Sequence, residues 1–181
     1  GDGDTIKITT SRVIDGNGAV IDMANSGHRA FSVTTDGVTI KNLTIKNANY
    51  NGYGGAIYFS QSGTVENCNF TNNHAEYDGG AIRMSSGSVT NCNFTGNKAT
   101  GSNSWGGAIL FAGKGSVTNC NFINNTATNG NGGAIYFYYG STGTVTNCNF
   151  TNNSARYGGA IYFEYGSTGT VTNCNFSGNT I

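Results

Sequence analysis

Residues 132–157 have the sequence GGAIYFYYGSTGTVTNCNFTNNSARY, and variants of this unit recur through most of the chain. Two anchors mark the copies. Gly-Gly-Ala-Ile begins at Gly54, Gly79, Gly106, Gly132 and Gly158, and Asn-Cys-Asn-Phe begins at Asn67, Asn91, Asn119, Asn147 and Asn173. Successive copies therefore start 24 to 28 residues apart. A period of this length indicates a solenoid, in which each repeat packs only on its neighbours.

Short segments within each unit alternate between apolar and polar residues, which is the pattern of strands and not of helices. In the last unit, the predicted strands are residues 160–163, 169–172 and 174–177. Strands this short cannot find hairpin partners within one unit. Stacked units, however, would pair each strand in parallel with its equivalent about 4.8 Å away. The sequence therefore predicts an all-β fold, a right-handed parallel β-helix.

The same period predicts about seven coils with three short strands each, in a single domain over residues 1–181. Residues 51–181 contain five regular repeats, and residues 1–50 contain degenerate N-terminal coils. The apolar positions of the first coil are expected at Ile6, Ile8, Val13 and Val20. We expect the chain to be a fragment of a longer array, because solenoids need capped ends and the sequence has no obvious caps.

Composition argues against several kinds of partner. The chain of 181 residues has nine Lys and Arg, nine Asp and Glu, and a formal net charge of zero. A nucleic-acid partner would require a basic face. Membrane insertion would require about 18 consecutive apolar residues, and no such run exists. We therefore expect no nucleic-acid binding, no direct membrane insertion by this segment and no cofactor.

Two columns of residues are predicted to hold the coils together. An asparagine at the bend between the second and third strands tolerates the left-handed backbone region, and stacked amides can hydrogen-bond along the column. This predicted ladder consists of Asn42, Asn67, Asn91, Asn119, Asn147 and Asn173. The paired glycines are expected to form a sharp turn before the first strand.

The cysteines occupy the position after that asparagine and are expected to be small, buried hydrophobes. They are Cys68, Cys92, Cys120, Cys148 and Cys174. Disulfides stay an alternative, because neighbours about 4.8 Å apart satisfy the Cα distance for a bridge. No metal site is expected, because the sequence has no Cys-x-x-Cys pair and only two histidines.

The most specific motif is the pairing of Gly-Gly-Ala-Ile with Phe-x-x-Asn, which occurs five times from Phe70…Asn73 to Phe176…Asn179. It resembles the repeats of chlamydial polymorphic outer membrane proteins. It is still more similar to adhesin-like surface proteins of methanogenic archaea, whose β-helices begin with stretches like residues 13–22. The resemblance covers essentially the whole chain. It implies an extracellular or cell-surface location and a role in adhesion, with a glycan or protein of another cell as the partner.

Aromatic residues form the predicted ligand-binding surface. The set comprises outward positions of the first strand and positions in the loop before the paired glycines: Tyr58, Tyr136 and Tyr162, and Tyr53, Tyr77, Trp105 and Tyr157. Stacking of the coils would bring both groups to one long edge, where exposed rings suit stacking on sugars. The alternative is that the tyrosines pack on one another and shield the sheet.

An enzyme is the main alternative function, because many right-handed β-helices with a pectate-lyase-like architecture are polysaccharide lyases or hydrolases. Such enzymes need paired carboxylates or an acidic Ca²⁺ cluster. The acids here are scattered, and the two local clusters are Glu76 with Asp78 and Asp15 with Asp22. We expect both clusters to lie in solvated loops and assign no catalytic residue.

Two further alternatives are an inert stalk and an ice-binding face. Ice binding would need a flat, regular threonine array. Thr90, Thr118, Thr146 and Thr172 form one such column, but the adjacent columns are expected to be asparagine.

Overall fold

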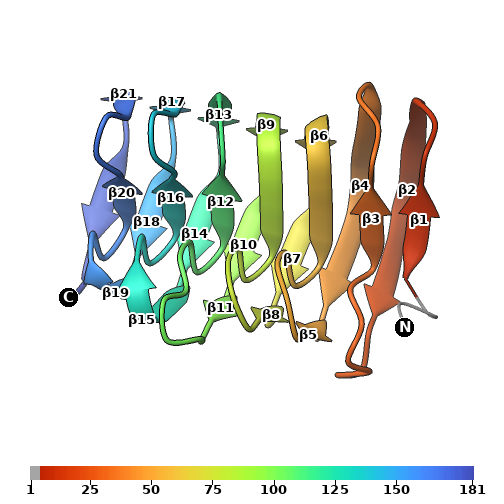
Figure 1. The fold of residues 1–181 in the computed structure, drawn as a ribbon, viewed down its shortest axis with the longest axis horizontal. Helices are drawn as coiled ribbons and strands as arrows, with labels where there is room; N and C mark the ends of the chain where they lie inside the picture. Colours follow the sequence, from red (N-terminus) through yellow and green to blue (C-terminus); the bar gives the residue numbers. More distant parts are fainter. Residues whose placement is uncertain (1–4) are drawn as a thin grey trace.

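The computed structural model describes residues 5–181 as a right-handed parallel β-solenoid of about seven coils. The coils stack along one long axis, with the N-terminus at one end and the C-terminus at the other (Figure 1). The fold predicted from the repeat is therefore confirmed. Within residues 5–181 the chain forms no helix, so no helix there is available to cross a membrane.

The strands form four stacks, each with about one strand from every coil. The first stack contains β1 (Ile6–Ile8), β3 (Phe31–Val33), the start of β6 (Ile57–Glu66), the start of β9 (Ile82–Thr90), β12 (Ile109–Phe111), β16 (Ile135–Phe137) and β20 (Ile161–Phe163). The second contains the first parts of β2 (Arg12–Asp22) and β4 (Val38–Lys46), the ends of β6 and β9, β13 (Gly115–Thr118), β17 (Thr142–Thr146) and β21 (Thr168–Thr172).

The third stack contains the ends of β2 and β4, then β7 (Asn69–Thr71), β10 (Asn93–Thr95), β14 (Asn121–Ile123), β18 (Asn149–Thr151) and β22 (Asn175–Ser177). A fourth, short stack was not predicted. It contains β5 (Asn49–Tyr50), β8 (His74–Ala75), β11 (Lys98–Ala99), β15 (Thr126–Asn131) and β19 (Ser154–Tyr157).

The core consists of apolar side chains stacked in columns from coil to coil, and in the regular repeats many columns keep one residue type. Strand pairing places Phe94 opposite Phe70 on one side and Phe122 on the other, with stacked rings 4.8–4.9 Å apart. All three rings are fully buried. A buried side chain of this size contributes about 1.5–3 kcal/mol, so each added coil stabilises the coils next to it.

In the first coil, the residues that face the core differ from those predicted. Val13 and Val20 are 61% and 59% exposed. Ile14 and Ile21 instead pack against the core, in register with core residues of the next coil. Val13 and Ile14 are adjacent apolar residues, as are Val20 and Ile21, so alternation alone did not decide which of each pair faces the core.

The two glycines of each pair have different structural roles at the bend before the first strand. Gly79 has a φ of 65°, a conformation that other residues rarely adopt. Gly80 has ordinary φ, but a Cβ there would lie 2.1 Å from the carbonyl oxygen of Gly107 in the next coil. The first glycine thus allows the turn and the second allows close contact between coils.

The predicted asparagine ladder is correct in its backbone and wrong in its hydrogen bonds. All six residues have φ between 51° and 56°. Among residues 5–181, however, one hydrogen bond joins members of this column, from Asn67 Nδ2 to Asn42 Oδ1 at 3.3 Å. From Asn67 onward the side chains are exposed to solvent, where water satisfies them.

The continuous ladder lies instead at the asparagine of Phe-x-x-Asn, which turns into the coil. Its members are Asn73, Asn97, Asn125, Asn153 and Asn179. In each step, the backbone N–H and the Nδ2 of one residue both donate to Oδ1 in the next coil, at 2.9–3.1 Å. A buried corner leaves backbone groups without water, so the amide that satisfies them is structurally required. A second, exposed ladder joins Asn69, Asn93, Asn121, Asn149 and Asn175 at 2.8–2.9 Å.

The cysteine column faces the core, and all five thiols are free. Four of them are buried, and Cys174 in the last coil is half-buried. The sulfurs of Cys92, Cys120, Cys148 and Cys174 each accept a weak hydrogen bond from the backbone N–H of the preceding cysteine, at 3.4 Å. The neighbouring thiols of Cys120 and Cys68, together with burial, raise the pKa of Cys92 well above its ordinary value. A neutral, buried thiol behaves as a packing group.

Candidate functional site

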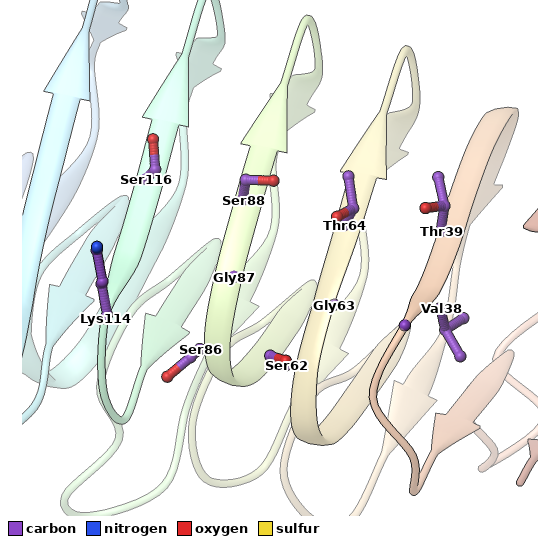
Figure 2. A pocket seen from close by; sticks show the side chains of 11 residues that line it. Val38, Thr39, Ser62, Gly63, Thr64, Ser86, Gly87, Ser88, Lys114 and Ser116 are labelled. Atoms are coloured by element: carbon purple, nitrogen blue, oxygen red, sulfur yellow. The ribbon is translucent and has the colours of Figure 1, made fainter. Parts of the chain in front are cut away.

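Two hollows on different faces of the solenoid are candidates for ligand binding. The larger, of about 460 Å³, lies over the second stack, on strands β4, β6, β9 and β13. Figure 2 shows Thr39, Thr64, Ser88 and Ser116 side by side on these four strands. Its only charged lining residue is Lys114, and no aromatic ring lines it. Such a surface provides hydroxyl groups but little to orient a ligand.

This face also corrects the expectation about the threonine columns. The outward column beside Thr146 is not asparagine, because Thr144 lies two residues earlier on the same strand and pairs with Ser116 and Thr170. Hydroxyl side chains thus occupy two adjacent columns. Charged residues interrupt them, since Glu66 pairs with Thr90.

The smaller hollow, of about 210 Å³, lies over the outward face of the first strands. Its walls are Tyr53, Asp78, Arg83, Trp105, Leu110, Ala112 and Tyr138. We call it the aromatic pocket. It combines three aromatic rings with one carboxylate and one guanidinium, contributed by four successive coils.

Two residues that line the aromatic pocket lie at the bend before the paired glycines. Asp78 and Trp105 each directly precede a first glycine, and the N–H of Gly79 donates to the carbonyl oxygen of Trp105 at 2.9 Å. Tyr53 occupies the same position one coil earlier, before Gly54. The register of the repeat therefore brings these three side chains to the same edge.

Asp78 is only 6% exposed, so the expectation of a solvated acidic loop is wrong for this residue. Its Oδ1 accepts a hydrogen bond from the backbone N–H of Trp105 at 3.2 Å. Burial raises the pKa of Asp78 to about 6, although this hydrogen bond and the charge of Arg83 act to lower it. Its neighbour Glu76 does not line the pocket.

Arg83 projects from β9 between two tyrosine rings. Its Cζ lies 5.0 Å from the ring centre of Tyr53 and 5.3 Å from that of Tyr58, which are cation–π distances. Nη1 donates to the hydroxyl of Tyr58 at 3.3 Å. Nε is buried and has no hydrogen-bond partner within residues 5–181. An unpaired buried donor costs about 1–3 kcal/mol.

The predicted aromatic residues divide into those that line the pocket and those that support it. Trp105 and Tyr53 line it. Tyr136 is fully buried, which contradicts its prediction as a ligand contact. The cause is stacking on both sides, with Trp105 at 5.3 Å and Tyr162 at 5.5 Å between ring centres. For Tyr136, the alternative that the tyrosines shield the sheet is correct.

The other predicted residues lie outside the pocket. Tyr77 is exposed and contacts Tyr53, with ring centres 5.2 Å apart. Tyr58 is half-buried beside Arg83, and Tyr162 is half-buried against Tyr136. Tyr157 is 52% exposed and lies beside Arg156.

Five lining residues of the pocket were not predicted as ligand contacts, and three of them, Asp78, Arg83 and Tyr138, have polar or aromatic side chains. Asp78 had a usable signal, because it occupies the same position before the glycines as Tyr53 and Trp105. Arg83 was placed on the outward face by alternation, but its charge gave no indication of a pocket. Tyr138 lies in the connection after β16, where the repeat has no fixed pattern.

No group of three or more His, Cys, Asp or Glu in residues 5–181 is arranged to hold a metal ion. Comparison with known proteins gives one family and no individual relative. Residues 29–181 match the model of the family described as right handed beta helix region. No curated protein and no solved structure matches the chain significantly. The family occurs both in enzymes, pectate lyase among them, and in proteins that are not enzymes. Since the match covers most of the sequence and the coils have the expected parallel stacking, the chain belongs to the right-handed β-helix family.

Proposed function

We propose that this chain is an adhesin-like carbohydrate-binding module that holds a neutral sugar ring in the aromatic pocket. The observation that carries the proposal is the grouping of Asp78 and Arg83 with three aromatic rings in one hollow. Sugar-binding sites commonly combine an aromatic face with a few polar groups of fixed orientation.

Each wall has a role in this proposal. A sugar hydroxyl donates to the carboxylate of Asp78, and a sugar oxygen accepts from the guanidinium of Arg83. The rings of Trp105 and Tyr53 pack against the apolar face of the sugar. When Asp78 is ionised, its charge balances that of Arg83, which favours a neutral sugar over an acidic one.

The size of the pocket limits the ligand to one ring. Its 210 Å³ is smaller than the roughly 300–1,000 Å³ of sites for drug-sized ligands. The chemistry also favours binding over hydrolysis. Glycoside hydrolysis generally needs two carboxylates that flank the bond, and Asp78 is the one carboxylate among the lining residues.

In the cellular setting that we propose, the module lies outside the cell and attaches it to glycans of another cell. The formal net charge of zero supports this role, because contact with a neutral glycan needs no electrostatic attraction. A protein ligand is the competing possibility for the same pocket.

A glycan array with neutral and acidic sugars tests the proposal. We expect wild type to bind neutral glycans and Asp78→Asn to bind them at least about tenfold more weakly, because a hydrogen bond to a charged group contributes about 1.5–3 kcal/mol. Asn keeps an oxygen that can accept from Trp105, so the fold should survive, and a thermal melt checks this.

Tyr157→Ala is the matched control, because it removes an exposed aromatic ring outside the pocket. It should bind as wild type does. Absence of glycan binding by wild type would refute the proposal, as would unchanged binding by Asp78→Asn. Hydrolysis or elimination of a bound glycan would instead identify an enzyme.

A further inference from the structure

Two projecting turns near the C-terminal end carry exposed tyrosines that the aromatic pocket does not use. Strand pairing sets Phe111 opposite Phe137 and Gly115 opposite Gly143, so the connection after β16 is two residues longer than the connection after β12. In the longer form, the N–H of Ser141 donates to the carbonyl oxygen of Tyr138 at 2.9 Å. With Gly140 at a φ of 70°, this is a type II turn that places Tyr139 at its tip.

The following coil repeats this turn in register. The N–H of Ser167 donates to the carbonyl oxygen of Glu164 at 2.9 Å, and Gly166 has a φ of 78°. Tyr165 is at its tip. The rings of Tyr139 and Tyr165 are stacked, with centres 6.1 Å apart. We call these two residues the tyrosine platform.

The platform is exposed but firmly held. Tyr139, which has a coil on each side of it, is 61% exposed, whereas the stacked Tyr136 is fully buried. Ser167 ties the two turns together, since its Oγ donates to the carbonyl oxygen of Tyr138 at 2.7 Å and accepts from Ser141 Oγ at 3.2 Å. A fixed pair of exposed rings provides stacking area at little cost in conformational entropy.

The platform begins one residue after Tyr138, which lines the aromatic pocket. The ring centre of Tyr138 lies 5.9 Å from that of Trp105. The pocket spans the coils up to Tyr138, and Tyr165 extends the aromatic surface by one more coil. Coils repeat about every 4.8 Å, close to the length of one pyranose unit in an extended chain.

We infer that the aromatic pocket and the tyrosine platform form one extended site for a neutral, β-1,4-linked glycan that runs along the solenoid axis. The pocket holds one ring, and the platform stacks on rings further along the chain. The inference rests on the proposed function and adds the class and direction of the glycan. An extended chain fits because it advances about one ring per coil, whereas a tightly coiled chain would leave the surface.

Calorimetric titration with glucose, cellobiose and cellotetraose tests this inference. We expect wild type to bind cellotetraose about tenfold or more tightly than glucose, because additional rings reach the platform. A Tyr139→Ala, Tyr165→Ala double variant should lose this gain and keep the affinity for glucose. Both residues are exposed at turn tips, so the fold should be retained. Tyr157→Ala, which also removes an exposed tyrosine, should keep the gain.

The results separate this inference from the proposed function. If wild type binds glucose and cellotetraose equally, or if the double variant keeps the gain, the extended site is refuted while a one-ring pocket stands. If wild type binds no neutral sugar on the array or in this series, the proposed function fails, and the extended site fails with it.

Discussion

The outward face of the first strands has two halves with different chemistry on the same backbone. In the N-terminal half, the guanidinium groups of Arg29 and Arg83 lie near the ring of Tyr58, at cation–π distances of 5.0 and 5.3 Å from its centre. In the C-terminal half, the rings of Trp105, Tyr136 and Tyr162 are stacked nearly parallel. Strand register is the same in both halves, so the side chains alone make the difference.

The junction between the halves explains where the pocket lies. The outward column runs from Arg83 through Leu110 to Tyr136. Leu110 is shorter than either neighbour, and the space above it is the aromatic pocket. Two continuous stacks would leave no such gap. A binding site can therefore arise from one short side chain in an otherwise regular column.

The largest expected effect comes from a substitution that removes one ring of the C-terminal aromatic stack. Tyr136→Ala should lower the free energy of unfolding by about 3–5 kcal/mol, as for other large buried aromatics, because Tyr136 is fully buried between two rings. Tyr58, in the N-terminal half, is only half-buried. Tyr58→Ala should therefore lower the free energy of unfolding by about half as much. Denaturant unfolding of both variants measures the difference. Equal costs would mean that the two halves are energetically alike.

A smaller effect concerns Asp78, at the junction. Its pKa in the folded protein is about 6, above the ordinary value of 3.8, so between these pH values the folded state binds more protons than the unfolded state. Stability should therefore rise as pH falls from 7 to 4, by an amount on the order of 2–3 kcal/mol. Asp78→Asn should lack this contribution.

The difference between wild type and Asp78→Asn isolates the effect, because other carboxylates act oppositely. Hydrogen bonds lower the pKa values of Asp15, Asp22 and Asp36, so their contributions are lost as pH falls. Both proteins share these three groups. If the two pH profiles run parallel, Asp78 is not the buried acid that its surroundings indicate.

The smallest expected effect on stability comes from a substitution that joins the two halves of the outward face. Leu110→Tyr would continue the column with a ring and fill the pocket. We expect the free energy of unfolding to change by less than about 1 kcal/mol, because the ring enters existing space, and we expect binding of neutral sugars to be lost. Leu110→Met, a change of similar volume, is the control. Sugar binding by Leu110→Tyr would place the ligand elsewhere.

The fold was predictable because every coil repeats the same signal. In the last unit, residues 161–163, 169–172 and 175–177 were predicted to be strand and are strand. The fourth stack was missed because strands such as His74–Ala75 are two residues long and show no alternation. The hydrogen-bonded ladder was misplaced because the repeat contains several asparagine columns of equal regularity. The structure distinguishes Asn125, which is buried, from Asn119, which is exposed and has a φ of 54°.

The candidate site was less predictable because it depends on departures from the repeat. Alternation placed Tyr136 on the outward face correctly, but its burial results from Trp105, which comes from a loop of variable length. Although Trp105 lies in a loop, it packs as part of the C-terminal aromatic stack. It is half-buried and covers Tyr136, so truncating it should cost stability as well as binding. The gap above Leu110 is a property of three neighbouring coils, and no single repeat contains it.

The buried ladder of Phe-x-x-Asn has a direction. From Asn73 to Asn153, each Nδ2 points to the oxygen of the next coil, so the amide dipoles are aligned head to tail. Aligned amides polarise one another, which makes each hydrogen bond stronger than it would be alone. The solenoid is consequently a polar column as well as a repetitive one. A coil stacked in the opposite sense would bring oxygen against oxygen, so the ladder permits growth of the array in one orientation only.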